Sequence, residues 1–387
     1  MVREHKEELI TLRRDFHAHP ELGFEEFRTA KVIEEYIQSL GLSTERVAKT
    51  GVVALLSGTD PSGPVLLMRA DIDALPVKEE TGLPFLSTNG RMHACGHDAH
   101  MAMMLTALKI LSKNRDLFKG TIKFVFQPNE EVAGAQVMID EGVLENPKVD
   151  AAIGLHIWSP LPSGIIGIKS GAVTASMDVF KITINGRGGH TGYPDSAKDP
   201  IICASNVIIA AQSIQTRFIN PMKPISLMFG IMNGGTKNNI IPDSVVLEGS
   251  LRYLYSTKPG NEDHPTTKFI ELVNSVCATF GCTAQIDILH ENDAVVNNSS
   301  MAMLAQEVAV SLVGKENVVE HATMAGEDFA AFGENVPAMF AFIGTANEKA
   351  KSTYPHHNPK FTIDEETLPL GVQYLVETAI AYFKRGT

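Results

Sequence analysis

The segment MHACGHDAHMAMMLTALKIL, residues 92–111, joins a dense group of metal-binding side chains to an apolar, helix-like run. Cysteine thiolate and neutral imidazole are the side chains that hold zinc and other borderline transition metals. Cys95 and His97 stand two positions apart, and Gly96 between them permits a sharp turn that directs both side chains to one site. We therefore infer a bound metal and a helix that begins directly beside it.

Short apolar runs bounded by Gly, Pro and Asp lie on both sides of this segment. Residues 52–56 and 65–68 precede it, and residues 121–126 and 151–155 follow it. Runs of this length and composition are typical of strands buried inside a sheet. Because the strands alternate with helices, we predict an α/β fold, a mixed sheet flanked by helices.

A different pattern begins near Asp178. Period-two strands and amphipathic segments follow in the order strand, helix, strand, strand, helix, strand, up to about Ile288. This order predicts a compact α+β sandwich of about a hundred residues. We expect a metal-binding catalytic domain, residues 1–177 and 290–387, and an inserted α+β domain, residues 178–289.

The composition narrows the function. The chain has 387 residues, 44% of them hydrophobic, and a net charge of -12 without any Lys/Arg-rich run. Binding to a phosphate backbone needs clustered cations, so we exclude a nucleic-acid partner. No apolar run approaches the ~20 residues of a membrane span, and the first residues lack an apolar signal core. The four cysteines are too few for a disulfide framework, so we expect a cytoplasmic protein.

Residues 92–100 do not complete a metal site alone, so further ligands should lie at the ends of other strands. The candidates are Glu130-Glu131, His156 and His356-His357. In an adjacent acidic pair, one carboxylate can bind a metal while its neighbour takes a proton from the attacking water. A solvated pair at a helix start is the more common case for such a pair by itself. Beside Cys95 and His97, we favour the metal interpretation.

Other polar residues have more than one interpretation. Asp71 and Asp73 alternate after a strand, so both can orient a ligating histidine, and a salt bridge to Arg69 is an equal alternative. Glu327 belongs to an acidic helix start, which we interpret as a cap.

Two groups in the inserted domain are candidates for substrate binding. Glycines before His190 allow a turn that aims this histidine outward, where it could stabilise an oxyanion. Asn239 and Arg252 could hold a substrate carboxylate together. The spacing alone favours a simpler interpretation, in which Asn239 stabilises a turn and Arg252 is a surface residue.

Taken in order, these motifs resemble the M20 metallopeptidase family, and within it the aminoacylase/amidohydrolase branch. The resemblance runs nearly end to end. It rests on His17 with Pro20-Glu21-Leu22, residues 68–76, residues 93–100, residues 127–131, Gly154-Leu155-His156, residues 186–190, residues 239–252, residues 326–329 and His357-Asn358-Pro359.

The resemblance implies two divalent metal ions held by Cys95, His97, Glu131, His156 and His357. Cysteine and histidine donors suit zinc, and carboxylate donors admit manganese or cobalt. It implies Glu130 as the general acid/base and His190 as the histidine that stabilises the oxyanion. Asn239 and Arg252 match positions that bind the substrate carboxylate. The inserted domain would serve as lid and dimer interface, in a homodimer or a higher homo-oligomer.

The sequence departs from the pattern at Asn129, where the branch usually has alanine, and this change could tune the base or the substrate fit. The doublet His356-His357 also offers two imidazoles for one ligand position, and the residue before Asn358 is the better match.

We therefore predict a metal-dependent amidohydrolase that cleaves N-acyl-L-amino acids to a carboxylate and a free amino acid. A metallo-carboxypeptidase or dipeptidase that acts on short peptides is an alternative. A non-catalytic metal- or peptide-binding protein is a second alternative, against which the intact Glu130, His190 and ligand set argue.

Overall fold

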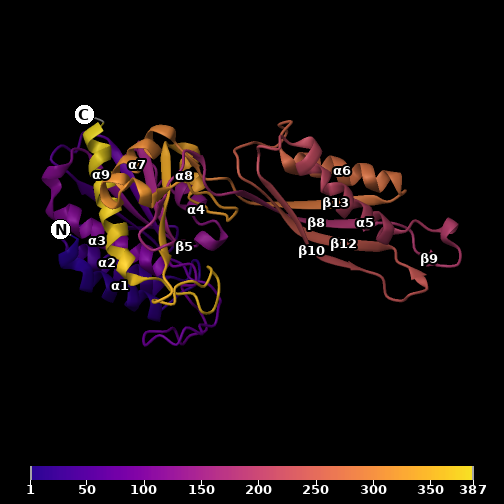
Figure 1. The fold of residues 1–387 in the computed structure, drawn as a ribbon, viewed down its shortest axis with the longest axis horizontal. Helices are drawn as coiled ribbons and strands as arrows, with labels where there is room; N and C mark the ends of the chain where they lie inside the picture. Colours follow the sequence, from indigo (N-terminus) through magenta and orange to yellow (C-terminus); the bar gives the residue numbers. More distant parts are fainter. Residues whose placement is uncertain (1, 386–387) are drawn as a thin grey trace. The chain divides into compact units, whose positions relative to one another are not determined.

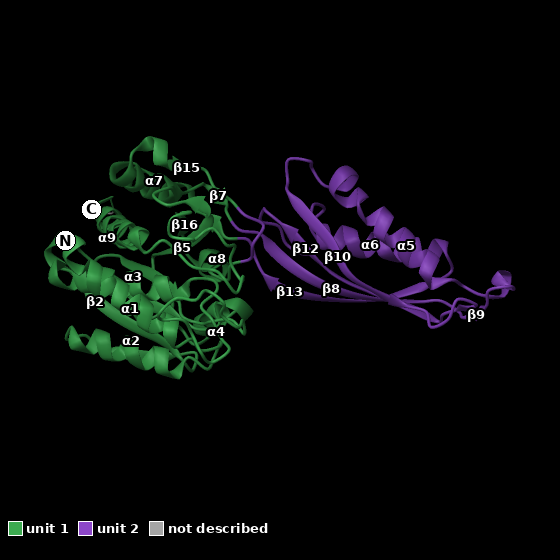
Figure 2. Ribbon diagram, turned by 60° about the horizontal axis from the view of Figure 1, so that its bottom comes forward, with its two compact units in different colours: residues 1–173, 295–322, 327–387 green, residues 174–294, 323–326 purple. Residues whose placement is uncertain are grey.

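The computed structural model describes residues 2–385, and the chain divides into two compact units (Figures 1 and 2). Unit 1 consists of Met1–Val173, Val295–Ala322 and Glu327–Thr387. Unit 2 consists of Thr174–Ala294 and Thr323–Gly326. The predicted insertion, residues 178–289, falls inside unit 2.

Unit 1 is built on an 8-stranded sheet in the order β1-β2-β4-β3-β5-β16-β6-β15. The central strands β4, β3, β5 and β16 are parallel neighbours. Antiparallel pairs join β1 to β2, β2 to β4 and β6 to β16, and β15 is parallel to β6. The strands are β1 (Thr44–Val47), β2 (Gly51–Ser57), β3 (Val65–Asp71), β4 (Thr121–Gln127), β5 (Ala151–Pro162), β6 (Ile166–Gly167), β15 (Val318–Val319) and β16 (Ala338–Ala346). A small ladder pairs β7 (Gly171–Ala172) with β14 (Val296–Asn297).

Helices cover both faces of this sheet (Figure 2). The larger core cluster packs five helices against one face: α1 (Lys6–Ala18), α2 (Phe27–Ser39), α3 (His97–Lys113), α7 (Ser299–Val313) and α9 (Leu368–Arg385). The smaller cluster packs α4 (Ala135–Asp140) and α8 (Ala330–Asn335) against the other face. Every residue of β3 and β4 is buried, as expected for parallel strands covered on both sides. The prediction of a mixed sheet flanked by helices is confirmed.

Short single-turn segments connect these elements. In unit 1 they are η1 (Arg3–His5), η2 (Arg115–Leu117), η3 (Glu130–Val132), η6 (Lys315–Asn317) and η7 (Glu365–Thr367). In unit 2 they are η4 (Pro194–Ser196) and the π-helical η5 (Ile214–Phe218). Of these, η3 matters most for the candidate metal site, because it carries Glu130 and Glu131.

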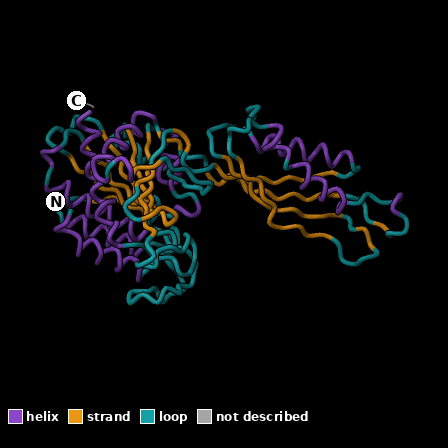
Figure 3. The backbone as a smooth tube through the Cα atoms, in the orientation of Figure 1, coloured by secondary structure: helices purple, strands orange, loops and turns teal. Residues whose placement is uncertain are grey.

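Unit 2 is an α+β sandwich, as predicted. Its 4-stranded antiparallel sheet has the order β10-β12-β8-β13. The strands are β8 (Ser176–Asn185), β10 (Ile225–Gly234), β12 (Ser244–Tyr253) and β13 (Thr283–Asn292). Helices α5 (Pro200–Ala211) and α6 (Pro265–Thr279) lie on the same side of the sheet (Figure 3). A short ladder pairs β9 (Gly189–His190) with β11 (Ile240–Ile241).

One strand boundary differs from the prediction. The sequence placed His156 just beyond the end of a strand at residues 151–155, whereas β5 continues to Pro162. Ile157 and Trp158 are β-branched and aromatic residues, which fit a pleated strand, so the strand does not end at the histidine. Among residues 2–385, no helix is long and apolar enough to cross a membrane.

Candidate metal centre

Cys95 and His97 lie on the turn that starts α3. Gly96 caps the helix with φ 94°. A Cβ atom on this glycine would stand 2.2 Å from Cδ1 of Ile157, and positive φ also disfavours any side chain. Only glycine fits here, and it directs Cys95 and His97 into a common space above the strands.

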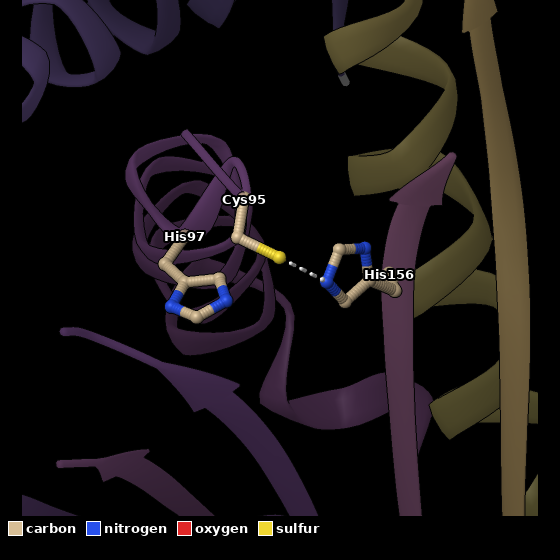
Figure 4. A group of neighbouring side chains, drawn as sticks. All are labelled: Cys95, His97 and His156. Carbon is tan, nitrogen blue, oxygen red and sulfur yellow. Dashed lines mark hydrogen bonds between the residues drawn. The ribbon is translucent and has the colours of Figure 1, made fainter. Parts of the chain in front are cut away.

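Cys95, His97 and His156 form the first group of metal-binding side chains. Their ligand atoms all lie within 4.8 Å of one another. Figure 4 shows Cys95 between the two imidazoles, with its Sγ 3.5 Å from Nε2 of His156. Nδ1 of His156 is occupied by the carbonyl oxygen of Ile157, so its Nε2 is the nitrogen that faces the group.

Asp73 holds His97 in place. The Nδ1–H of His97 donates to the carbonyl oxygen of Asp73 at 2.9 Å and to its Oδ1 at 3.1 Å. Nε2 of His97 is buried and has no hydrogen-bond partner among the described residues. Oδ2 of Asp73 accepts the backbone N–H of Glu131 at 3.1 Å. Asp73 therefore orients two ligand candidates, which is one of the two interpretations that the sequence analysis gave for Asp71 and Asp73. Asp71 forms the other, a salt bridge with Arg69.

Glu131 and His357 form a second group with Cys95. The ligand atoms of these residues also lie within 4.8 Å of one another. Nε2 of His357 is 3.4 Å from Oε1 of Glu131, an oxygen that is buried without a hydrogen-bond partner in the described chain. The backbone N–H of His357 donates to Ala94 at 2.8 Å, which fixes the loop beside Cys95.

The structure distinguishes the two imidazoles of the doublet. Nδ1 of His356 lies 3.2 Å from the carbonyl oxygen of Cys95, and its Nε2 accepts the N–H of Ser159 at 3.2 Å. Both nitrogens of His356 are therefore occupied by the backbone, whereas Nε2 of His357 points to Glu131. This geometry favours His357 as the ligand and gives His356 a structural role.

The donor set fits a pair of divalent ions. The two groups overlap at Cys95, and a third group of His97, Glu130 and Glu131 connects them. Thiolate, imidazole and carboxylate are the donors that zinc, manganese and cobalt use. The unpartnered buried atoms Nε2 of His97 and Oε1 of Glu131 are those that a metal would bind.

The surroundings tune the charge of these donors. Burial and nearby imidazoles lower the pKa of His156 well below its usual value, which keeps it in the neutral, metal-binding form. Burial, with Glu131 and Glu130 nearby, raises the pKa of the Cys95 thiol. Burial opposes a charge on His97, but Asp71, Asp73 and Cys95 outweigh it and raise its pKa well above the usual value. Protons therefore compete with a metal for Cys95 and His97.

Glu130 lies beside the ligand candidates on η3. Its Oε2 is 3.8 Å from Nε2 of His97. Burial raises the pKa of Glu130 well above its usual value, and the carboxylates of Glu327, Glu131 and Asp328 raise it further. A carboxyl group with a raised pKa is suited to take and return a proton near neutral pH.

Asn129 shapes the turn that carries this pair. It has a left-handed backbone, φ 55°, which asparagine tolerates better than most residues. Its Nδ2 donates to the carbonyl oxygen of Val132 at 3.2 Å, and its backbone N–H donates to Oε1 of Glu26 at 3.0 Å. The departure from alanine thus stabilises the turn that positions Glu130 and Glu131.

A buried charge network lies next to the metal centre, and the sequence analysis anticipated only its Arg69–Asp71 salt bridge, not the pairing of Arg69 with Glu327 and Asp328. Arg69 is fully buried, and its guanidinium contacts Asp71 at 2.7 Å, Glu327 at 3.0 Å and Asp328 at 2.9 Å. The interpretation of Glu327 as a simple helix cap was incomplete: α8 starts later, at Ala330, and Glu327 pairs with Arg69. Burial raises the pKa of Glu327 to about 7, although Arg69 lowers it.

His100 belongs to the same network. Its Nδ1 lies 2.6 Å from Oδ1 of Asp71, and its Nε2 accepts the N–H of Ile157 at 3.0 Å. Because both ring nitrogens of His100 already have partners, this histidine supports the site structurally and is not available as a metal ligand. The three histidines within residues 93–100 indicated a metal site. The sequence did not show which of their imidazoles has a nitrogen available to bind a metal.

The predicted substrate-binding residues lie in unit 2. His190 is exposed on β9, and its Nδ1 accepts the N–H of Gly192 at 2.9 Å. Asn239 is exposed just before β11, and Arg252 on β12 donates to the carbonyl oxygen of Met324 at 2.8 Å. Their roles in substrate binding stay predictions.

Cysteine, imidazole and carboxylate donors gathered at one edge of an α/β sheet, with a further carboxyl group beside them, define a metal-dependent hydrolase. Residues 67–381 match the model of peptidase family M20/M25/M40, so the chain belongs to this family of hydrolases that act on amide bonds.

Curated relatives and solved structures share nearly the whole chain. It is 39% identical to N-acetyl-L-cysteine deacetylase of Bacillus subtilis over 97% of this chain and 88% of that protein. It is 38% identical to thermostable carboxypeptidase 1 of Saccharolobus solfataricus, over 96% of this chain and 94% of that protein. A crystal structure of the Bacillus subtilis YXEP protein, described as a dinuclear metal binding peptidase, superposes with a TM-score of 0.83 at 34% identity, covering 99% of both chains.

Proposed function

We propose that this protein cleaves the amide bond of N-acyl-L-amino acids, releasing a carboxylate and a free amino acid. The observation that carries the proposal is the overlap of two donor groups at Cys95, with Glu130 beside them. A relative named N-acetyl-L-cysteine deacetylase supports an acylated amino acid as the substrate.

The chemistry divides between metal and protein. Divalent ions bound by Cys95, His97, Glu131, His156 and His357 would polarise the amide carbonyl and lower the pKa of water. Glu130 takes the proton from the attacking water and later gives it to the leaving nitrogen, a function that its raised pKa suits. Asp73 keeps His97 and Glu131 oriented throughout.

The groups of unit 2 have separate roles in the proposal. His190 stabilises the oxyanion of the tetrahedral intermediate. Asn239 and Arg252 bind the substrate carboxylate, which would make a free carboxylate a requirement for turnover. Unit 2 also serves as the lid and the dimer interface, and the protein acts as a cytoplasmic homodimer or higher homo-oligomer.

A second candidate is a metallo-carboxypeptidase or dipeptidase acting on short peptides. The relative named thermostable carboxypeptidase 1 favours it, because that protein is about as similar to this chain as the deacetylase is. The two candidates share the metal centre and differ only in what is attached to the carbonyl side of the amide.

The test is hydrolysis of a matched panel by metal-stripped protein and by protein restored with zinc, manganese or cobalt. N-acetyl and N-benzoyl amino acids are compared with dipeptides that carry the same C-terminal residue. We expect metal-dependent release of acetate or benzoate, with lower kcat/KM for the dipeptides. Faster cleavage of the dipeptides would replace the proposal with the second candidate.

A further inference from the structure

One aromatic side chain beside the metal centre, Trp158, is only partly buried. Trp158 follows His156 by two positions on β5, so both side chains leave the strand on the same face. Their ring centroids lie 5.8 Å apart at an interplanar angle of 82°. From Ala151 to Ser159, every residue of β5 except Trp158 is buried.

Neighbouring rings fix the indole in place. His356 stacks on it with 4.7 Å between centroids and 28° between planes. Phe342 contacts it at 5.2 Å and 64°, and His321 lies 5.9 Å away. Both nitrogens of His356 contact backbone groups, so the stacked ring is itself held in its orientation. The indole of Trp158 is therefore held among several rings, while part of its surface remains exposed.

A rigid indole next to a reacting centre is suited to recognise a ligand ring. Aromatic pairs attract at centroid separations of about 4.5–7 Å, beyond the gain from burying their area. Indole rings also bind with little loss of conformational entropy, because the side chain has few rotatable bonds. Because the two rings are adjacent, a substrate whose scissile amide is bound next to His156 would have its nearest substituents within reach of Trp158.

We propose that Trp158 forms an aromatic subsite that favours substrates with a flat ring close to the scissile amide. The ring can belong to the acyl group or to the amino acid side chain. The inference rests on the proposed function, because the cleaved amide places the ring against the indole.

The first test is kinetic. We compare kcat/KM for N-benzoylglycine and for N-acetylphenylalanine with kcat/KM for N-acetylalanine, in wild type and in Trp158→Leu. We expect the aromatic-to-acetylalanine ratio to fall about tenfold for the substrate whose ring meets the indole. The aromatic substrate whose kcat/KM ratio falls more shows whether Trp158 contacts the acyl group or the amino acid side chain. An unchanged ratio for both substrates would overturn the subsite.

Two variants separate the subsite from a structural effect. Trp158→Phe keeps an aromatic surface and should retain the ratio to within about threefold of wild type. Tyr382→Leu removes another partly buried aromatic ring of unit 1, which packs against the larger core cluster, and should leave the ratio unchanged. A ratio that falls equally in Trp158→Leu and Tyr382→Leu would assign the effect to stability and overturn the subsite.

The second test does not need turnover. Trp158 is the only tryptophan of the chain, so indole fluorescence reports on this position alone. In metal-loaded Glu130→Gln protein, N-benzoylglycine or N-acetylphenylalanine should change this fluorescence saturably, whereas N-acetylalanine should change it much less. A saturable change without hydrolysis in wild type would retain the subsite and refute the proposed function. Hydrolysis without any fluorescence change from the aromatic substrates would refute the subsite alone.

Discussion

Replacing Asp73 by asparagine tests how the chain positions its metal ligands. The carboxylate accepts from Nδ1 of His97 at 3.1 Å and from the backbone N–H of Glu131 at 3.1 Å. Asparagine has nearly the same shape, but only one of its two side-chain atoms can accept a hydrogen bond. The variant therefore keeps the packing and loses the charge and one acceptor.

The expected size of the effect follows from these contacts. Removing a carboxylate that supports a metal-binding histidine costs about 10- to 100-fold in metal affinity. That range corresponds to about 1.4–2.8 kcal/mol, which agrees with the net worth of about 1.5–3 kcal/mol for a hydrogen bond to a charged group. We expect the Kd for the divalent ion to rise by this factor.

The assay is isothermal titration of metal-stripped protein with zinc, in the presence of a competing chelator. Asp116→Asn, which makes the same charge change at an exposed position of η2, is the matched control. A Kd within twofold of wild type in a folded Asp73→Asn protein would refute the claim that Asp73 orients the ligands.

Further predictions concern the general base Glu130, the metal ligand His357, proton release on metal binding and the buried Arg69. Glu130→Gln should fold and bind metal but lose about 10²- to 10⁴-fold in kcat, measured with the best substrate of the panel. His357→Ala should bind fewer ions per chain by elemental analysis. Because His97 and Cys95 have raised pKa values, a metal must displace their protons. Affinity should therefore rise with pH, and titrations in buffers of different ionisation enthalpy should detect proton release. Arg69→Met leaves buried carboxylates without their cation and should lower the free energy of unfolding by about 3–5 kcal/mol, measured by urea denaturation.

Local patterns in the sequence predicted the fold well. The apolar runs that became β2, β3 and β4 are bounded by residues that end strands, and their alternation with helices required a layered sheet. The switch to period two near Asp178 likewise predicted the α+β sandwich of unit 2. The end of β5 was misplaced, because the chemistry of His156 suggested a boundary where Ile157 and Trp158 favour a continued strand.

The arrangement of the site depended on contacts that no local pattern contains. Arg69 and Asp328 are 259 positions apart, so their pairing could not be inferred from spacing. Similarly, only the structure reveals that the backbone occupies both nitrogens of His356 and leaves His357 to face Glu131. Motifs predicted which residue types gather at the site, and tertiary structure decides which atoms stay available.

The most direct test of the account is activity as a function of added metal. Metal-stripped protein is titrated with zinc, manganese or cobalt, and hydrolysis of an N-acyl-L-amino acid is measured together with bound metal by elemental analysis. Overlapping donor groups at Cys95 predict that activity rises until about two ions are bound per chain and then stays constant. Full activity without metal, or metal binding that leaves hydrolysis unchanged, would contradict the account.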